Sequence, residues 1–229
     1  MTMPRLVAVL LLCCCSAVGQ QAPVAVPGEP ANIQTVKDKL KHYHDCSEAD
    51  CYMPQMERQA DLAMGYLKHD VAAAKPGEKL AIVFDIDETV LSNWSTELHD
   101  DFAYVPADWN LCVALWCARA IPPTLRLFQE AEKDGVAVFF ITGRPEPQRN
   151  DTITNLKAEG FDHWEGLYLR PVDHPASQAV DEYKSGDRAE ILAKGYRIVV
   201  NVGDQMSDLT HEPLAEHSVK LPNPFYFIP

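Results

Sequence analysis

Basic residues are scarce in this chain. Its 20 lysines and arginines stand against 33 aspartates and glutamates, so the formal net charge is −13. This excess of negative charge opposes non-specific binding to nucleic acid or to an anionic membrane surface. We therefore expect no nucleic acid as a partner. An anionic small molecule would need a metal ion or a few well-placed cations at its own binding site.

Internal repeats and low-complexity tracts are absent, and no segment after the first 19 residues is apolar enough to cross a bilayer. The 229 residues, 47% of them hydrophobic, suffice for one sizeable core. We expect a single domain over residues 32–229 and no stable membrane span. These features leave the oligomeric state open.

The first 19 residues have the layout of a secretory signal peptide. Arg5 precedes an apolar run over residues 6–15, and small residues follow at Ser16–Gly19. A lipidated cysteine is the alternative, but no small residue precedes Cys13, Cys14 or Cys15. Residues 20–31 are rich in proline, alanine and valine and predict a mobile lead-in. The expected location is secreted or periplasmic.

Removal of this segment leaves four cysteines: Cys46, Cys51, Cys112 and Cys117. An even number in an exported chain favours disulfides. Zinc is the alternative, because both pairs are spaced Cys-x4-Cys, at the upper end of the usual ligand spacing. Sequence does not choose among the three possible disulfide connectivities. Bridges within each pair are the first expectation.

Helices and strands alternate through most of the chain. Residues 32–75 predict a helical extension that is broken near Cys46–Cys51 and Pro54. Strands are expected at 80–84, 136–141, 166–169 and 197–202, and helices at 122–133, 146–159 and 185–194. This order predicts a three-layer α/β/α Rossmann-like sandwich with a parallel sheet. The long connection over residues 93–118 is a candidate small cap.

Acidic and polar residues follow three of the expected strands. Asp85 and Asp87 come directly after the first, within Phe84-Asp-Ile-Asp-Glu-Thr-Val-Leu-Ser-Asn93. Two carboxylates so close repel each other, and burial adds to the cost, so a bound cation is the usual remedy. Carboxylate oxygens suit Mg²⁺. The sequence therefore predicts a magnesium site at a carboxyl edge of the sheet, where open α/β sheets bind ligands.

The remaining motifs complete a resemblance. Thr142-Gly143-Arg144 follows the second strand, Lys184 lies before the helix expected at 185–194, and Gly203-Asp204-x-x-x-Asp208 follows the last strand. This order resembles the haloacid dehalogenase (HAD) superfamily of phosphohydrolases. The stretch Asp85–Asn93 and the tail Lys220–Ile228 resemble the class B/class C acid phosphatase branch, which includes the plant vegetative storage proteins.

The resemblance implies catalytic roles for four residues. Asp85 would be the nucleophile that forms an aspartyl-phosphate, and Asp87 would be the general acid and then the general base. Lys184 would offset the charge of the phosphoryl group, and the Thr142 hydroxyl would hold its oxygens.

The resemblance also implies a metal site and substrate contacts. Mg²⁺ would be bound by the Asp85 and Asp204 carboxylates and the Asp87 backbone carbonyl, with Asp208 in support. Gly143 belongs to the expected phosphate-binding turn. The roles of six further residues stay open. Arg144 and Arg188 either contact phosphate or pair with acids, and His211 either lies in a loop or lines the pocket. The tryptophans either stack on the leaving group or belong to the core: Trp94, Trp109 and Trp116.

The expected function is an exported, magnesium-dependent acid phosphatase. Its substrate would be a small phosphomonoester such as a nucleotide, a sugar phosphate or an aryl phosphate. One alternative is a phosphotransferase on the same fold, which passes the phosphoryl group to an acceptor alcohol. Another is a storage or binding protein that has lost catalysis, although the intact Asp85 argues against it.

Overall fold

The computed structural model describes residues 27–174 and 179–228. The expected signal peptide over residues 1–19 and residues 20–26 of the expected lead-in lie outside the described residues. From Ile33 onwards the chain forms one compact unit. No helix of the described ranges is both long and apolar enough to cross a membrane.

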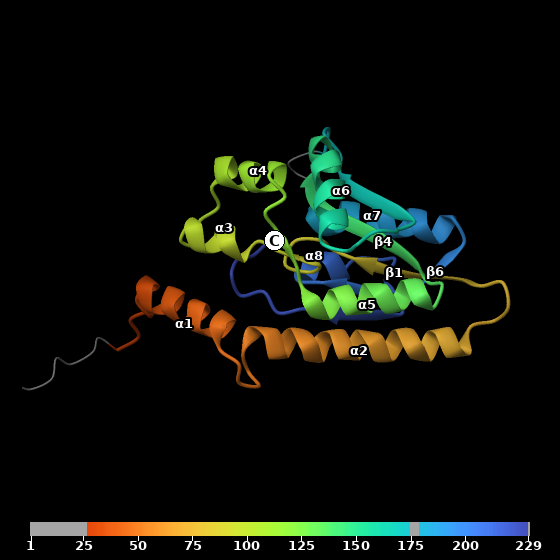
Figure 1. Ribbon diagram of the computed structural model, residues 1–229, viewed down its shortest axis with the longest axis horizontal. Coiled ribbons are helices and arrows are strands. Elements are labelled where there is room, and N and C mark those ends of the chain that lie inside the picture. Colours follow the sequence, from red (N-terminus) through yellow and green to blue (C-terminus); the bar gives the residue numbers. More distant parts are fainter. Residues whose placement is uncertain (1–26, 175–178, 229) are drawn as a thin grey trace, which may run out of the picture. The chain divides into compact units, whose positions relative to one another are not determined.

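A parallel sheet forms the centre of this unit (Figure 1). Its five strands lie in the order β5-β4-β1-β6-β7, which confirms the predicted α/β fold. β1 is continuously apolar after its first residue because helices cover both of its faces. The bounds are β1 Lys79–Phe84, β4 Ala137–Pro145, β5 Gly166–Arg170, β6 Tyr196–Gly203 and β7 His217–Lys220. β7 was not predicted, because it is short and buries only Val219.

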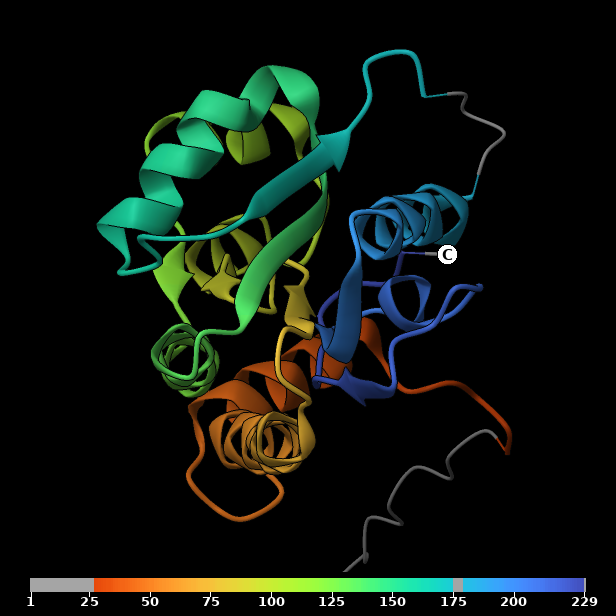
Figure 2. The same cartoon turned by 90° about the vertical axis from the view of Figure 1, so that its right-hand side faces the viewer.

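Helices cover the two faces of the sheet as separate layers (Figure 2). α2 (Tyr52–Ala73) and α5 (Pro122–Lys133) pack on one face, where Ile82 and Phe84 join their apolar side chains in the larger core. α7 (Val180–Ala193) packs on the other face, where Ala81 and Val83 meet Ile191 in a smaller core. Successive residues of β1 thus enter opposite cores, as the pleat of a strand requires.

The helical extension divides where the sequence predicts. α1 (Ile33–Asp45) and α2 are separated by the segment that the Cys46–Cys51 disulfide closes. Pro54 does not break α2, because it lies in the first turn, where a missing N–H leaves no hydrogen bond unmade. The apolar stripe of α2 is buried, as expected: Met56, Ala60, Ala63 and Leu67.

Two helix boundaries differ from the expected ones. α7 begins at Val180 rather than 185, so Lys184 lies inside the helix and not before it. The helix expected at 146–159 is a 3₁₀ turn, Glu146–Gln148, followed by α6, Arg149–Ala158. Propensity alone locates helix ends poorly, because the first turn has no internal hydrogen-bond partners for its N–H groups.

The connection at 93–118 contains two short helices, α3 (Trp94–His99) and α4 (Pro106–Ala114). A two-stranded antiparallel ladder joins its ends, with β2 (Leu91–Ser92) paired to β3 (Arg119–Ala120). The Cys112–Cys117 disulfide lies near the end of α4. Both disulfides therefore join cysteines within a pair, which is the connectivity expected first.

Candidate active site

Three buried carboxylates meet at the carboxyl edge of the sheet. Asp85 follows β1, Asp204 follows the neighbouring β6, and Asp208 lies in the short helix α8 (Met206–Leu209). Carboxylate oxygens of all three lie within 4.8 Å of one another. The exposed fractions are 7%, 1% and 4%, so water screens their repulsion poorly.

Lys184 reaches this cluster from α7. Its Nζ lies 2.7 Å from Asp85 Oδ1 and also donates to Asp208 Oδ1. Burial by itself would lower the pKa of Lys184, but the nearby Asp208 and Asp85 outweigh it and raise that pKa well above its ordinary value. Lys184 is therefore a fixed positive charge at the bottom of the site.

Neutral groups orient the other two carboxylates. Asp204 Oδ2 accepts hydrogen bonds of 2.7 Å from the side chains of Gln205 and Asn223, and its Oδ1 accepts one of 3.1 Å from Thr89. Asp208 Oδ2 accepts from the backbone N–H of Gln205. Position 203 must be glycine, because a Cβ there would lie 2.4 Å from the Cβ of Asp208.

Arg188 holds the backbone around Asp208 in place. Its guanidinium donates to four backbone carbonyls: those of Asp208, Thr210, His211 and Pro213. All four of these acceptors are backbone carbonyls, and Arg188 is not among the described residues that line the cavity introduced below. Its role in the described structure is to fix the turn that carries a carboxylate.

Asp87 does not belong to this three-carboxylate cluster. It forms a forked ion pair with the buried guanidinium of Arg144, at 3.0 Å and 2.6 Å from Nε and Nη2, and accepts 3.0 Å from Asn93. Of the two roles left open for Arg144, pairing with an acid is the one observed. The metal role expected for Asp87 concerned its backbone carbonyl, so the position of the side chain does not contradict it.

Glu88, the next residue in the chain, is also a buried acid. Glu88 accepts hydrogen bonds from the Asn93 backbone at 2.6 Å and from the Tyr226 hydroxyl at 2.7 Å. Burial, helped by the charge of Asp87, raises the pKa of Glu88 to about 8. This network ties the start of the 93–118 connection to the C-terminal segment.

The acidic cluster fits a divalent cation. Among the described residues, Lys184 is the one lysine in ion-pair contact with the three carboxylates, so two formal negative charges lack a contacting cation. Burial raises the pKa of Asp85 well above its ordinary value, and burial together with Asp208 raises the pKa of Asp204 to about 7. Without a metal the site therefore tends to retain protons. A hard cation would favour the ionised carboxylates instead.

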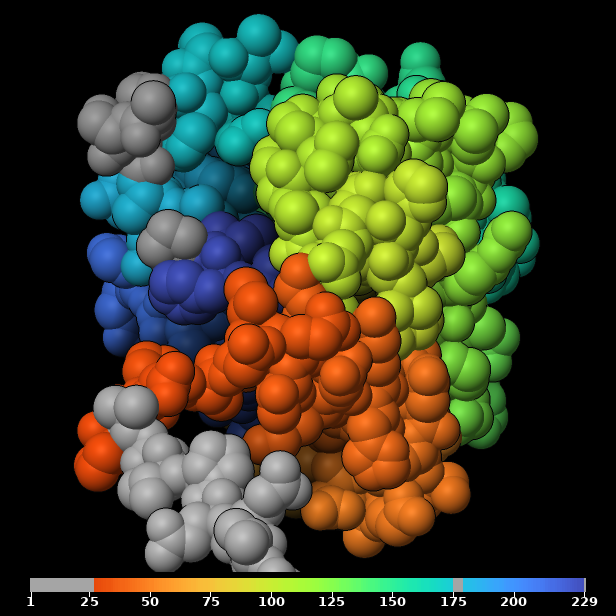
Figure 3. Space-filling model, turned by 90° about the vertical axis from the view of Figure 1, so that its left-hand side faces the viewer, coloured from red at the N-terminus to blue at the C-terminus, as the bar shows by residue number. Residues whose placement is uncertain are grey.

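A cavity of about 490 Å³ opens above these residues. Asp85, Asp87, Lys184, Asp204 and Asp208 line its inner end. The 93–118 connection and the C-terminal tail supply much of its outer wall. The residues they contribute are Thr96, Glu97, Asp100, Phe102, Ala103, Tyr104, Val105, Trp109, Tyr226, Phe227 and Ile228. In Figure 3 the lime surface of that connection stands beside the dark blue surface of the C-terminal residues.

The cavity includes only some of the expected substrate contacts. Gly143 and Arg144 line it, whereas Thr142 is fully buried beside it and accepts a hydrogen bond from the Arg144 backbone. The structure does not bring Trp94 to the cavity; its indole stacks on His44 with ring centroids 3.7 Å apart. Trp109 lines the wall instead.

His211 was expected either in a loop or in the pocket lining. It lies in a loop and not in the cavity lining. It is exposed, and its Nδ1 lies 2.9 Å from Asp181. Trp116 is 43% exposed and also lies away from the cavity lining.

Several residues that build the site were not predicted from the sequence. Asn93, Asn223 and Tyr226 bind the acids described above, and Tyr183 and Ser207 line the cavity. Asn93 and the two tail residues lie within stretches that carried the family resemblance, so their position was a usable signal. Tyr183 precedes Lys184 and gave no signal of its own.

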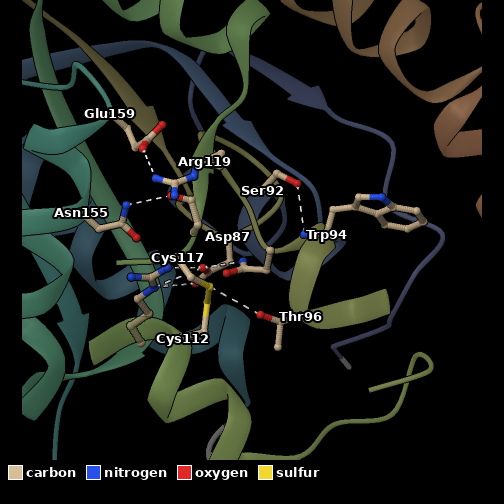
Figure 4. The surroundings of a disulfide bond; sticks show 12 residues. Asp87, Ser92, Trp94, Thr96, Cys112, Cys117, Arg119, Asn155 and Glu159 are labelled. Atoms are coloured by element: carbon tan, nitrogen blue, oxygen red, sulfur yellow. Dashed lines mark hydrogen bonds and ion pairs between the residues drawn. A yellow bond between two sulfur atoms is a disulfide. The ribbon is translucent and has the colours of Figure 1, made fainter. Parts of the chain in front are cut away.

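The Cys112–Cys117 disulfide touches the cavity wall. Thr96 Oγ1 lies 3.6 Å from Cys117 Sγ, and Figure 4 shows Thr96 directed at that sulfur. Thr96 also lines the cavity. The Cys46–Cys51 disulfide contributes no lining residue from the described chain.

We therefore expect different effects from removing the two disulfides. Replacing either pair with serine should cost about 2 kcal/mol, because each closes a short loop, and should lower Tm by roughly 4–8 °C. Cys112→Ser/Cys117→Ser should also raise KM, because it loosens the wall at Thr96. Cys46→Ser/Cys51→Ser is the matched control and should leave KM unchanged. Equal KM values for the two variants would contradict this prediction, and an intact mass without the loss of four hydrogens would refute the bridges.

The raised pKa values predict that the metal-free protein loses stability as pH rises. Glu88 and Asp204 have folded-state pKa values of about 8 and about 7, against ordinary values of 4.5 and 3.8. The stability that these two groups contribute is fully present below about pH 4, where they are protonated in the folded and in the unfolded protein. It is lost as the pH rises through 7 and 8, where they ionise in the folded protein as well. We expect Tm in a chelator to fall from pH 5 to pH 8 by on the order of 10 °C.

Two controls test the origin of this slope. Glu88→Gln keeps an acceptor for Asn93 but cannot ionise, so it should flatten the slope. A divalent cation should raise Tm more at pH 8 than at pH 5. A Tm that rises between pH 5 and pH 8 in the chelator would contradict the prediction.

Comparison with known proteins matches this geometry to one family. The family model described as HAD superfamily, subfamily IIIB (Acid phosphatase), matches residues 17–229. Acid phosphatase 1 of Solanum lycopersicum is 38% identical over 185 residues, which cover 77% of this chain and 69% of the tomato protein. Vegetative storage protein 2 of Arabidopsis thaliana is 34% identical over 155 residues, or 64% of this chain and 56% of that protein.

Solved structures support the fold. The class C acid phosphatase from Bacillus anthracis superposes with a TM-score of 0.70, covers 85% of this chain and 86% of its own, and is 21% identical. Its structure with tungstate bound superposes with a TM-score of 0.66 at 23% identity and covers 84% of this chain and 85% of its own. The acid phosphatase relatives support phosphomonoesterase activity. With the family model matching nearly its whole length, the chain belongs to the acid phosphatases of HAD superfamily subfamily IIIB.

Proposed function

We propose that this protein is an exported, magnesium-dependent acid phosphatase that hydrolyses phosphomonoesters through an aspartyl-phosphate on Asp85. One observation carries the proposal. Asp85 lies at the inner end of an open cavity, in contact with Lys184 and beside two further carboxylates. A nucleophile, a fixed cation and a set of hard oxygen ligands thus face the same space.

Two displacements at phosphorus make up the proposed reaction. In the first, an oxygen of Asp85 bonds to phosphorus and the bond to the leaving oxygen breaks, while Asp87 gives that oxygen a proton. In the second, Asp87 takes a proton from water, whose oxygen displaces Asp85 and releases phosphate. The ion pair with Arg144 and the hydrogen bond from Asn93 would hold the Asp87 carboxyl group in one orientation throughout.

Charge balance supports these roles. Lys184 would offset the negative charge of the phosphoryl group as it moves between oxygens. The Asp85, Asp204 and Asp208 carboxylates would hold the metal, together with the Asp87 backbone carbonyl. When bound, Mg²⁺ would supply further positive charge to the phosphoryl oxygens.

Both disulfides support a location outside the cytoplasm, where such bonds persist. Aromatic side chains in the outer wall, among them Phe102, Tyr104 and Trp109, would accept aryl, nucleoside or sugar leaving groups by apolar contact. We propose small phosphomonoesters as substrates and no nucleic acid, in line with the net charge of −13.

A panel of nucleotides, sugar phosphates and aryl phosphates, assayed with and without Mg²⁺, tests the proposal. Phosphate release that requires the metal and peaks below neutral pH is the expected result. Addition of simple alcohols tests for phosphotransfer, because a transferase would yield an alkyl phosphate at the expense of free phosphate.

The similarity to vegetative storage proteins makes a non-catalytic storage role the second candidate. Purified protein that binds Mg²⁺ but releases no phosphate from any member of the panel would favour that role and would reject the phosphatase.

A further inference from the structure

One hydroxyl in the cavity has no evident structural purpose. The side chain of Tyr183 is buried, with 7% of the residue exposed, and lines the cavity. Its Oη has no hydrogen-bond partner anywhere in the part of the chain that the structure describes. Buried hydroxyls are normally paired, because an unpaired one loses its bonds to water without replacement. A phenylalanine would fill the same space at no such cost, so the hydroxyl points to a ligand.

The position of this hydroxyl indicates which ligand atom it faces. Tyr183 precedes Lys184, whose Nζ contacts the proposed nucleophile. A Cβ built on Gly143 would lie 3.5 Å from Tyr183 Oη, so the hydroxyl also faces the last residues of β4. Lys184 on α7 and Thr142-Gly143 on β4 are the two places where the family resemblance implies phosphate contacts. Tyr183 lines the same cavity as Lys184 and Gly143.

Ser207 also has a buried hydroxyl without a partner among the described residues. It lies on α8 between Asp204 and Asp208, so a metal-bound ligand would account for it. Tyr183 is on α7, next to Lys184, and on none of the elements that carry the three carboxylates. Its hydroxyl therefore calls for a partner of a different kind.

We propose that Tyr183 is a substrate-contacting residue whose hydroxyl donates a hydrogen bond to a non-bridging oxygen of the phosphoryl group. The proposal rests on the proposed function, since it takes phosphate as the group bound beside Asp85. Burial raises the pKa of Tyr183 to about 12, so the hydroxyl keeps its proton and remains a donor across the working pH range. The neutral Tyr183 hydroxyl would favour binding of the charged phosphoryl oxygens without adding a charge to the site.

Tyr183→Phe removes the hydroxyl and keeps the ring. Binding of inorganic phosphate to the Mg²⁺-loaded protein, measured by calorimetry, should weaken about 10- to 100-fold, the usual range for a hydrogen bond to a charged group. The value of kcat/KM should fall by a similar factor. Tm without phosphate should stay the same or rise, because the variant no longer buries an unpaired hydroxyl. The phosphate-induced rise in Tm should shrink.

Tyr168→Phe is the matched control. Its hydroxyl accepts a 2.7 Å hydrogen bond from Lys194 and lies outside the cavity lining. This control should leave phosphate affinity and kcat/KM unchanged. A second variant, Gly143→Ala, would place a methyl group against the Tyr183 hydroxyl and should also weaken phosphate binding in the wild-type background.

Several results would overturn the proposal. Phosphate affinity within twofold of wild type in Tyr183→Phe would show that water, not phosphate, pairs with the hydroxyl. A lower Tm of phosphate-free Tyr183→Phe would indicate that the hydroxyl has a structural role and would refute the proposal. A wild-type protein that binds no phosphate would also refute the proposal. A wild-type protein that binds phosphate but does not hydrolyse esters would refute the proposed function and leave the role of Tyr183 intact.

Discussion

Asp85→Asn is expected to abolish turnover while the fold survives. An amide oxygen cannot form the aspartyl-phosphate, so kcat should fall by several decades, on the order of the losses seen when other covalent nucleophiles are removed. Lys184 retains its partner Asp208 in this variant, so the buried lysine is not left unpaired. Tm in the absence of metal should equal or exceed that of wild type, because one of three mutually repelling carboxylates is gone.

Steady-state kinetics with an aryl phosphate and thermal unfolding measure these two outcomes. Acid quenching with ³²P-labelled substrate should trap label on wild type and none on the variant. Asp162→Asn is the matched control, because Asp162 is exposed and lies outside the cavity lining. Wild-type-like turnover in Asp85→Asn would remove Asp85 from its proposed role.

Removal of divalent metal is expected to have an effect of comparable size. The two formal negative charges left unpaired beside Lys184 would then be balanced by protons, since burial raises the pKa of Asp85 well above its ordinary value. A protonated Asp85 is a poor nucleophile, so turnover in a chelator should fall to background and return with Mg²⁺.

Calcium separates binding from catalysis in this experiment. It should bind and raise Tm but restore little activity, because its longer and more variable coordination distances would misplace the reacting groups. Asp204→Asn is a further test, because it removes a carboxylate proposed to bind the metal but keeps an acceptor for Asn223. Its Mg²⁺ requirement should rise by at least tenfold. Undiminished phosphatase activity after exhaustive chelation would exclude the proposed mechanism.

The sequence by itself determined the fold class and the region of the site. Short apolar runs alternating with amphipathic helices predict a parallel sheet, and parallel strands carry their carboxyl ends to one edge. Asp85 and Asp204 directly follow such strands, so their convergence follows from topology. Thr142 lies inside β4 and not after it, because the strand continues to Pro145, beyond the end expected at 141. These inferences need only local pattern and chain order, which a sequence contains in full.

Only the tertiary structure decided what each side chain contacts. Asp87 turns to Arg144, which is 57 residues away in the chain, and Asp204 accepts from Asn223, 19 residues away. Trp94 packs on His44, whereas Trp109 lines the cavity. Such choices depend on the direction of each side chain and on the packing of elements distant in sequence. Local propensity does not encode either of these, so the unpaired hydroxyl of Tyr183 can be recognised only in the folded structure.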